Sequence, residues 1–490
     1  MTKILLVYVN SYMDNLVPLG ISGLSACLKK SGHDVKLFDT TLYRTREESG
    51  DDARVAALQI KKTNLTDFGI VGLADVEGSF LRTLEEYSPD LIGFSVVEST
   101  WSIARRLLAI AKKYPAIKVV GGIHATMASD LIIGVPEVDI VCVGEGERAL
   151  VELADCIGSK RDYSKINNLV IKQDGKVLKN PIGPLANLDE LPDQDWTLYD
   201  RKRFYKPMGG KIWISGPIEL SRGCPYHCSF CCNDHLHELY GGKGKYYRER
   251  GVDRFINELK TKKVQYGLEY LYLVSENFLQ MSASRFARFI EQYQDLKMPF
   301  WIETRPETVT LEKAKKLKAI GCEGISIGVE HGNDDFRRRM LKRFVSDEVI
   351  KKAFFCAHEA GMRVCANNII GFPEETYELV FDTIKLNRAL KATNVITNIF
   401  VPYRGTPLWQ ACVDRGYIDK DDIAGDYRMD SVLNMPQLSA ERVKGLQRTF
   451  PLYVKLPQRR WPDIKRAESL DVEGNKIFEL LAREYRECFM

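Results

Sequence analysis

The sequence lacks the features that mark membrane, secreted and nucleic-acid-binding proteins. Its 490 residues contain no run of about 18 apolar residues, so we expect no transmembrane helix. Residues 1–10 hold one lysine and a short apolar run, without the longer apolar core and small-residue cleavage site of a signal peptide. The net charge of +4 is too small to indicate a nucleic acid or an anionic membrane surface as a partner.

A disulfide framework is also absent. Twelve cysteines are spread over the chain with one tight cluster, which contains Cys224, Cys228 and Cys231. This distribution fits a reducing compartment and a metal site, so we expect a cytoplasmic protein. The apolar fraction of 45% and the charged fraction of 28% are those of a globular protein, and the length allows two or three domains.

The three clustered cysteines form a C-x3-C-x2-C pattern after a strand-like apolar run at residues 212–221. Three thiolates on one loop can hold three irons of a cubane iron–sulfur cluster and leave the fourth iron open for a small molecule. Zinc is the alternative, with His227 or His235 as fourth ligand, although structural zinc sites usually pair their cysteines as C-x2-C twice. We expect the neighbouring Cys232 to be a small buried or partly exposed side chain.

This loop, with the aromatic residue Phe230 just before its last cysteine, resembles the signature loop of radical SAM enzymes. The resemblance implies one 4Fe-4S cluster held by Cys224, Cys228 and Cys231. It also implies that the open iron binds S-adenosyl-L-methionine (SAM).

Residues 1–155 alternate strand and helix patterns, which predicts a doubly wound, Rossmann-like α/β domain. Ligands of such sheets bind beyond the carboxyl ends of the strands. Small residues stand at those predicted ends and would let a ligand approach the backbone, although tight turns are an alternative reason for them. They are Ser95, Gly121, Gly122, Gly144 and Gly146.

Gly-Gly-x-His-x-Thr at 121–126 and Val-Gly-Glu-Gly-Glu at 143–147 resemble the cobalamin-binding domain that precedes many radical SAM domains. The Asp-x-His-x-x-Gly motif, which supplies a histidine to cobalt in methionine synthase-like proteins, is absent. We therefore expect a displaced cobalamin base, no histidine on the lower face of cobalt, and the loop 96–101 under the corrin. The cobalamin contacts implied by the resemblance are Ser95, Val97, Glu98, Gly121, Gly122, His124, Thr126, Gly144, Glu145 and Gly146.

The rest of the chain divides into three further parts. Residues 156–212 are predicted to be a linker with a small hairpin at 165–178 and an acidic connector at 188–196 that swings the first domain over the next. Residues 213–410 show recurring β/α units with six parallel strands, a partial (β/α)6 barrel. Residues 411–490 are predicted to form a C-terminal helical cap, with a docking surface as the alternative.

Polar residues follow the predicted barrel strands, where β/α barrels carry their chemistry. Solvated loop residues and helix caps are the alternative reading. The set resembles the SAM-binding motifs of radical SAM barrels, which implies that Glu276 binds the methionine amino group and Arg305 the carboxylate. By the same resemblance Glu330 holds the ribose and Asn368 lines the adenine site. Tyr403 and the loop 404–409 are candidates for the substrate side, with Tyr403 as the candidate catalytic residue.

The order of a cobalamin domain, a radical SAM barrel and a helical cap resembles the cobalamin-dependent (class B) radical SAM enzymes. The resemblance implies a C-methyltransferase in which a 5′-deoxyadenosyl radical removes a substrate hydrogen and methylcobalamin supplies the methyl group. A peptide side chain or a small molecule would be the substrate, and a ferredoxin or flavodoxin the reductant. The alternatives are a cyclase or rearrangement enzyme without methyl transfer, and a non-enzymatic corrinoid or iron–sulfur sensor.

Overall fold

The computed structural model describes residues 1–14 and 16–490, which divide into two compact units. Unit 1 comprises residues 1–49, 64–206 and 232–251, and unit 2 comprises residues 50–63, 207–231 and 252–490. Neither unit is a continuous stretch of chain. Each therefore receives short segments from sequence regions that mostly belong to the other.

Unit 1 is built on one sheet in the order β2-β1-β3-β4-β5-β6-β7. The strands β1 to β5 run parallel, which confirms the predicted doubly wound α/β domain. The hairpin β6–β7 continues the sheet antiparallel beyond β5, so it is an edge of this sheet. The strands are β1 (Lys3–Tyr8), β2 (Asp34–Asp39), β3 (Leu91–Ser95), β4 (Ile117–Gly121), β5 (Ile140–Cys142), β6 (Leu169–Gln173) and β7 (Lys176–Lys179).

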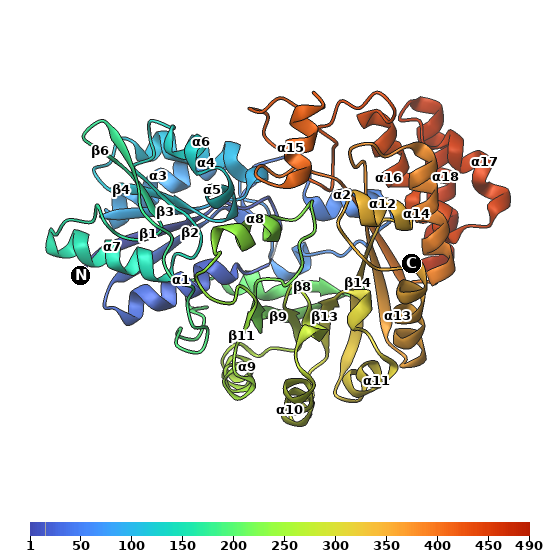
Figure 1. The fold of residues 1–490 in the computed structure, drawn as a ribbon, viewed down its shortest axis with the longest axis horizontal. Helices are drawn as coiled ribbons and strands as arrows, with labels where there is room; N and C mark the ends of the chain where they lie inside the picture. The colour runs from blue at the N-terminus through green and yellow to red at the C-terminus, as the bar shows by residue number, and fades with distance from the viewer. Residues whose placement is uncertain (15) are drawn as a thin grey trace. The chain divides into compact units, whose positions relative to one another are not determined.

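Helices cover both faces of this sheet (Figure 1). On one face α1 packs against α7, and on the other α3 packs against α4. Apolar strand residues such as Leu5, Val7 and Phe94 are buried against Phe80 and Leu107 of these helices, which removes their surface from water. The helices are α1 (Leu19–Lys30), α3 (Val76–Tyr87), α4 (Trp101–Ala111), α5 (Ile123–Met127), α6 (Ser129–Ile133), α7 (Glu147–Ser159) and α8 (Cys232–Leu239).

The acidic connector is hydrogen bonded to unit 1. The Asp195 carboxylate accepts from the Ser25 hydroxyl at 2.7 Å and pairs with the Lys29 ammonium at 2.7 Å. Further along, the Arg203 guanidinium donates to Asp39 at 2.8 Å. The connector up to residue 206 is therefore part of unit 1.

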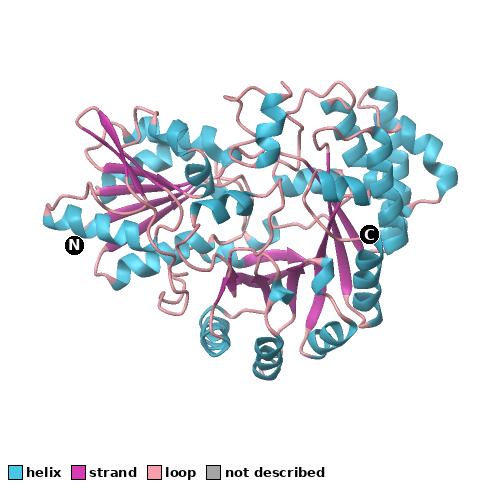
Figure 2. Ribbon diagram, viewed as in Figure 1, coloured by secondary structure: helices cyan, strands magenta, loops and turns pink. Residues whose placement is uncertain are grey.

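Unit 2 contains a curled sheet in the order β16-β15-β14-β13-β12-β9-β8 (Figure 2). The strands β9 and β12 to β16 run parallel, which confirms the predicted partial barrel. The edge strand β8 (Tyr205–Met208) was not predicted. The parallel strands are β9 (Lys211–Glu219), β12 (Tyr270–Val274), β13 (Phe300–Thr304), β14 (Cys322–Glu330), β15 (Arg363–Ile370) and β16 (Asn394–Ile399).

Helices line the outer face of the curled sheet (Figure 1). They are α9 (Val252–Tyr266), α10 (Ala283–Tyr293), α11 (Leu311–Ala319), α13 (Asp347–Glu359) and α14 (Tyr377–Leu390). Shorter helices α12 (Asp334–Arg339) and α15 (Pro407–Asp414) follow β14 and β16. The inner face of the sheet is thereby left for other segments of the chain.

One of those segments comes from the N-terminal part of the chain. Residues 50–63 belong to unit 2 and contain α2 (Gly50–Ala56). The Gln59 side chain donates to the Thr397 carbonyl at 3.0 Å and accepts from the Thr397 N–H at 3.2 Å. Ile60 packs against a buried cluster that includes Trp301 and Ile396. This segment satisfies backbone groups of the edge strand β16 that would otherwise be open to pairing.

The C-terminal region is helical, with α16 (Ala440–Lys455), α17 (Trp461–Arg466) and α18 (Val472–Phe489). The helix α16 packs on β16 and α14, while Trp461 lies edge-on to Phe381 and Tyr453. Much of the aromatic surface of residues 453–466 is thus used inside unit 2. None of the helices in the described part of the chain has the length and apolarity that a membrane span requires.

Candidate active site

The cysteine loop follows β9 and the short strand β10 (Ser221–Arg222) in unit 2. Neighbouring loops hold it by backbone contacts at Ser229, whose N–H donates to Leu341 at 3.2 Å and whose carbonyl accepts from Leu408 at 3.1 Å. The Cys231 N–H closes a turn on the Cys228 carbonyl at 3.0 Å. These contacts fix the loop at the carboxyl ends of the strands.

The three thiols suit an iron–sulfur cluster. The pKa of Cys224 is raised to about 12, mainly by burial and in smaller part by Glu276, Cys231 and Cys228, against an opposing backbone hydrogen bond at Tyr226. A cationic group is therefore needed to hold three thiolates together here. In the described part of the chain, no three His, Cys, Asp or Glu side chains are grouped to hold one metal ion. A cubane takes each thiolate on a separate iron, so this geometry favours the cluster over zinc.

Arg305 follows β13 and reaches the cysteine loop. Its Nη1 donates to Cys228 Sγ at 3.3 Å, while Nε and Nη2 donate to Glu307 Oε1 at 2.8 and 2.6 Å. Its guanidinium carbon lies 3.7 Å from the ring centroid of Tyr226. The arginine predicted to meet the SAM carboxylate is therefore already engaged by the loop and by Glu307.

Glu330 ends β14 at a register shift and has φ of 64°, a left-handed conformation that a non-glycine residue adopts at a cost. Burial raises the pKa of its carboxyl, while Arg343 and Arg305 lower it. The Arg343 guanidinium lies 3.6 Å from Oε1, and a side chain at Gly328 would meet the same oxygen. The strand end thus presents a carboxylate beside two guanidinium groups.

Two further predicted residues, Asn368 and Tyr403, belong to the last two strands of the barrel and the loop that follows them. The Asn368 amide is fully buried and exchanges hydrogen bonds of 3.1 and 2.7 Å with Asn387 of α14. Its side chain faces the helix and is taken up by these contacts. Tyr403 lies in the loop after β16, where its carbonyl accepts from the Thr406 hydroxyl at 2.7 Å. Phe230 packs near Phe372, with ring centroids 6.0 Å apart.

The inner face of the sheet carries a polar group that the sequence did not reveal. The Tyr272 hydroxyl and the Glu303 carboxyl are hydrogen bonded, and Arg54 of α2 and the Cys365 thiol are close enough to affect their pKa values. Burial raises the pKa of Glu303, while Tyr272 and Arg54 lower it. The Arg54 Nε is buried without a hydrogen-bond partner among the described residues. The barrel interior therefore holds a buried guanidinium group and a buried carboxyl group close together.

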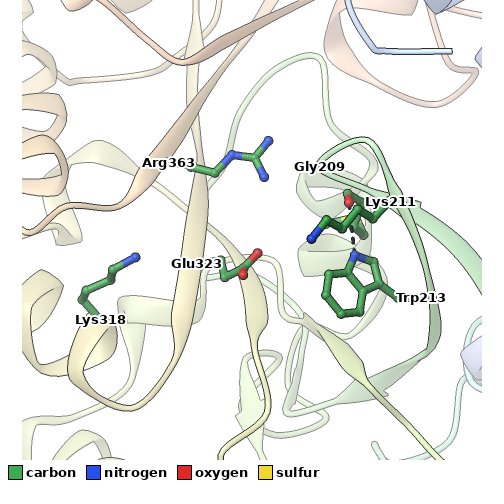
Figure 3. Close-up of a pocket in the computed structure, with 7 residues that line it drawn as sticks. Gly209, Lys211, Trp213, Lys318, Glu323 and Arg363 are labelled. Atoms are coloured by element: carbon green, nitrogen blue, oxygen red, sulfur yellow. Dashed lines mark hydrogen bonds between the residues drawn. The ribbon is translucent and has the colours of Figure 1, made fainter. Parts of the chain in front are cut away.

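A separate cavity of about 270 Å³ lies at the opposite, amino-terminal ends of the strands (Figure 3). Figure 3 shows the side chains of Arg363, Glu323 and Trp213 around it, with the Trp213 indole N–H donating to the Met208 carbonyl at 3.1 Å. The chemistry of β/α barrels sits at the carboxyl ends of their strands. This cavity is therefore not part of the candidate active site.

In unit 1, the turns after β3, β4 and β5 interlock. The Val96 N–H donates to the Gly121 carbonyl at 3.0 Å, and the Gly144 N–H donates to the Thr126 hydroxyl at 2.9 Å. Gly122 has φ of 95°, and a side chain there would lie 2.6 Å from the Val96 carbonyl oxygen. Val97 is 44% exposed, so the set offers a backbone surface with one open apolar side chain, as a flat ligand requires.

Glu145 is bound by segments remote in sequence. Its carboxylate accepts from Arg248 Nη1 at 3.2 Å and from the Ala186 N–H at 2.9 Å. Its own N–H donates to the Tyr240 hydroxyl at 2.7 Å. The Glu145 side chain thus fixes the connector and the segment after α8.

His124 is buried within unit 1. Its ring centroid lies 5.6 Å from that of Trp101, and its Nδ1 lies 3.9 Å from the Glu98 carboxylate. Glu98 is itself buried, at 5% exposure. The two side chains predicted to contact cobalamin, His124 and Glu98, are therefore buried beneath the surface of the turns and stabilise them.

Two known family models match this chain, one for each unit's candidate site. The model of the radical SAM superfamily matches residues 218–386, and that of the B12 binding domain matches residues 5–154. An uncharacterised methyltransferase of Pyrococcus horikoshii is 27% identical over 439 residues, covering 88% of this chain and 86% of the relative. An anaerobic magnesium-protoporphyrin IX monomethyl ester cyclase of Cereibacter sphaeroides is 24% identical over 374 residues. The aligned part covers 73% of this chain and 59% of the cyclase.

A solved structure has the same fold. The radical S-adenosylmethionine methyltransferase TsrM of Kitasatospora setae, with cobalamin and a [4Fe-4S] cluster bound, aligns over 99% of both chains with a TM-score of 0.67 and 17% identity. Cobalamin, SAM and a 4Fe-4S cluster are the cofactors that the two matched domains imply. The chain therefore carries a B12 binding domain followed by a radical SAM domain, and in this order of domains it is similar to cobalamin-dependent radical SAM methyltransferases.

Proposed function

We propose that the protein transfers a methyl group to an unactivated carbon of a peptide side chain or small molecule. One observation carries the proposal. The cysteine loop, Arg305, Glu276 and Glu330 gather at the carboxyl ends of the barrel strands in a chain that also carries a cobalamin-binding domain. A SAM radical site and a methyl-carrying cofactor in one chain suit methylation of a carbon that lacks a reactive electron pair.

In this proposal Cys224, Cys228 and Cys231 hold the 4Fe-4S cluster, and Phe230 packs beside it. Glu276 and Glu330 bind the amino and ribose groups of SAM, and the backbone at Asn368 lines the adenine. When bound, these cofactors supply a carbon-centred radical and a transferable methyl group. The protein's share is to hold them in a site that excludes water and competing partners.

Cobalamin is proposed to lie on the turns of unit 1. The backbone of Gly121, Gly122, Gly144 and Gly146 would approach it, with Ser95 and Val97 at the strand end and Thr126 tying the turns together. We propose no histidine ligand to cobalt, because His124 is buried between Trp101 and Glu98. This agrees with the missing histidine motif.

The methyl acceptor is proposed to occupy the barrel interior, near Arg54, Tyr272 and Glu303, with Tyr403 on the same side. The buried Nε donor of Arg54, which has no hydrogen-bond partner among the described residues, and the Glu303 carboxyl offer it opposite polar groups. A small iron–sulfur or flavin protein such as ferredoxin or flavodoxin would supply the electron that reduces the cluster. Nucleic acid is not proposed as a partner, because the net charge is only +4.

The test uses full-length protein purified without oxygen. We expect one cubane and about one cobalamin per chain, and 5′-deoxyadenosine after reduction with SAM. Incubation with methyl-deuterated SAM and an extract of the source cells should then give a product that carries the label. Two clusters, or no cobalamin after reconstitution, would contradict the proposal. Lack of 5′-deoxyadenosine would favour a sensor.

A cobalamin-dependent cyclase or rearrangement enzyme is the second candidate, favoured by the similarity to the protoporphyrin ester cyclase. It would form 5′-deoxyadenosine as well but leave the label of methyl-deuterated SAM out of its product. The fate of the label therefore separates the two reactions.

A further inference from the structure

The guanidinium of Arg305 is held on two sides. Glu307 Oε1 accepts from both Nε and Nη2, at 2.8 and 2.6 Å, which occupies one edge of the planar group. The Tyr226 ring lies flat against it, with the guanidinium carbon 3.7 Å from the ring centroid. Arg305 is only 7% exposed. An arginine held in this way has little freedom to change partners.

The cysteine loop provides one of these sides. Tyr226 lies between Cys224 and Cys228 in the sequence, and its hydroxyl donates to Gln280 at 3.1 Å. The remaining edge of the guanidinium points Nη1 at Cys228 Sγ, 3.3 Å away. The loop therefore holds Arg305 in place through Tyr226 and presents the Cys228 sulfur to its Nη1–H group.

We propose that Arg305 is a positioning residue that donates an N–H···S hydrogen bond to the cluster thiolate of Cys228 and raises the reduction potential of the cluster. Reduction adds one electron to the cluster, supplied by the external reductant. A donor aimed at a ligand sulfur stabilises the more negative reduced state more than the oxidised one. This inference rests on the proposed function, because it requires the cluster on these cysteines.

The inference assigns Arg305 a different role from SAM carboxylate binding. Glu307 takes the edge that a carboxylate fork would use. Arg343 lies near the same strand end, is 3% exposed, and bonds to Gly328 and Glu330. Arg343 therefore supplies a matched control, a buried arginine of equal charge that lies close by and donates to no cysteine in the described structure.

The experiment is a redox titration of the anaerobically reconstituted full chain without SAM, followed by electron paramagnetic resonance. Arg305→Lys keeps the charge but removes the directed donor, so we expect its midpoint potential to become more negative. Arg343→Lys should keep the wild-type potential. An unchanged potential in Arg305→Lys would overturn the inference, and weakened SAM binding with that result would restore the carboxylate role.

A second measurement does not depend on any variant's folding. Wild-type protein with 15N-labelled arginine should show nuclear coupling between a guanidinium nitrogen and the reduced cluster in a double-resonance experiment. No such coupling in a protein with a full cluster would refute the hydrogen bond. If the wild type assembles no cluster on these cysteines, the proposed function itself fails, which is a distinguishable outcome.

Discussion

The turn at Gly144 provides a sharp test of how the cobalamin-binding edge is built. Gly144 has φ of 79°, and a Cβ added there would lie 2.2 Å from the Tyr240 hydroxyl oxygen. In Gly144→Ala the left-handed backbone costs about 1 kcal/mol. Displacing Tyr240 also leaves the Glu145 N–H without its partner, at about 1–3 kcal/mol. The expected total loss is about 2–4 kcal/mol in the free energy of unfolding.

Gly175→Ala is the matched control. Gly175 has φ of 73° in the β6–β7 turn, and nothing lies within 4 Å of its added Cβ, so only the backbone cost of about 1 kcal/mol applies. Urea unfolding of the cobalamin-free protein, followed by circular dichroism, would compare the two variants. We also expect Gly144→Ala, but not Gly175→Ala, to weaken cobalamin binding.

Equal losses of unfolding free energy in Gly144→Ala and Gly175→Ala would contradict this reasoning. A further check comes from adding Tyr240→Phe to Gly144→Ala. Removing the hydroxyl removes the closest clash, so the double variant should lose less than the sum of the two single losses. Simple additivity would show that the added methyl group does not meet Tyr240.

Three further predictions follow from the barrel. Cys224→Ala should abolish the visible absorption of the reconstituted cluster, whereas Cys232→Ala should keep it; equal losses would contradict the three-cysteine assignment. Burial raises the pKa of Glu303 above the ordinary 4.5, so the folded chain holds that proton to higher pH than the unfolded chain. The unfolding free energy should therefore fall as pH rises from 4.5 through the raised value, and Glu303→Gln should remove this loss in a pH series of urea titrations; an unchanged pH profile would argue against it. Asn368→Ala leaves the buried amide of Asn387 without its partner and should cost about 1–3 kcal/mol of stability in the same unfolding assay. Weaker SAM binding with full stability would instead indicate a side-chain contact to the ligand.

Local sequence patterns were sufficient to predict most strands of the two sheets. The continuous apolar run at residues 4–9 and the glycine turns after the later strands carry their signal within about ten residues. The cysteine spacing is equally local, because all three proposed ligands lie on one loop. These features could therefore be predicted from the sequence.

The interior of the barrel could not be predicted in this way. Residues 50–63 are polar around α2, and Gln59 gains its two hydrogen bonds only from Thr397, which lies 338 residues away in the chain. Arg54 and Tyr272 were missed for the same reason, since each owes its role to distant partners. Strand parity was an available signal for Asn368, because Cys365 and Asn367 share one face of β15 and Asn368 must take the other.

The division of the chain into discontinuous units decides how its parts can be prepared. Truncation before residue 64 would deprive the barrel of Gln59 and Ile60, and deletion of residues 232–251 would remove Tyr240 and Arg248 from the cobalamin unit. The peptide bond between Cys231 and Cys232 joins the proposed cluster loop of unit 2 directly to α8 of unit 1. No single cut can therefore release either unit intact, and a gene for either unit alone would need at least two splice points.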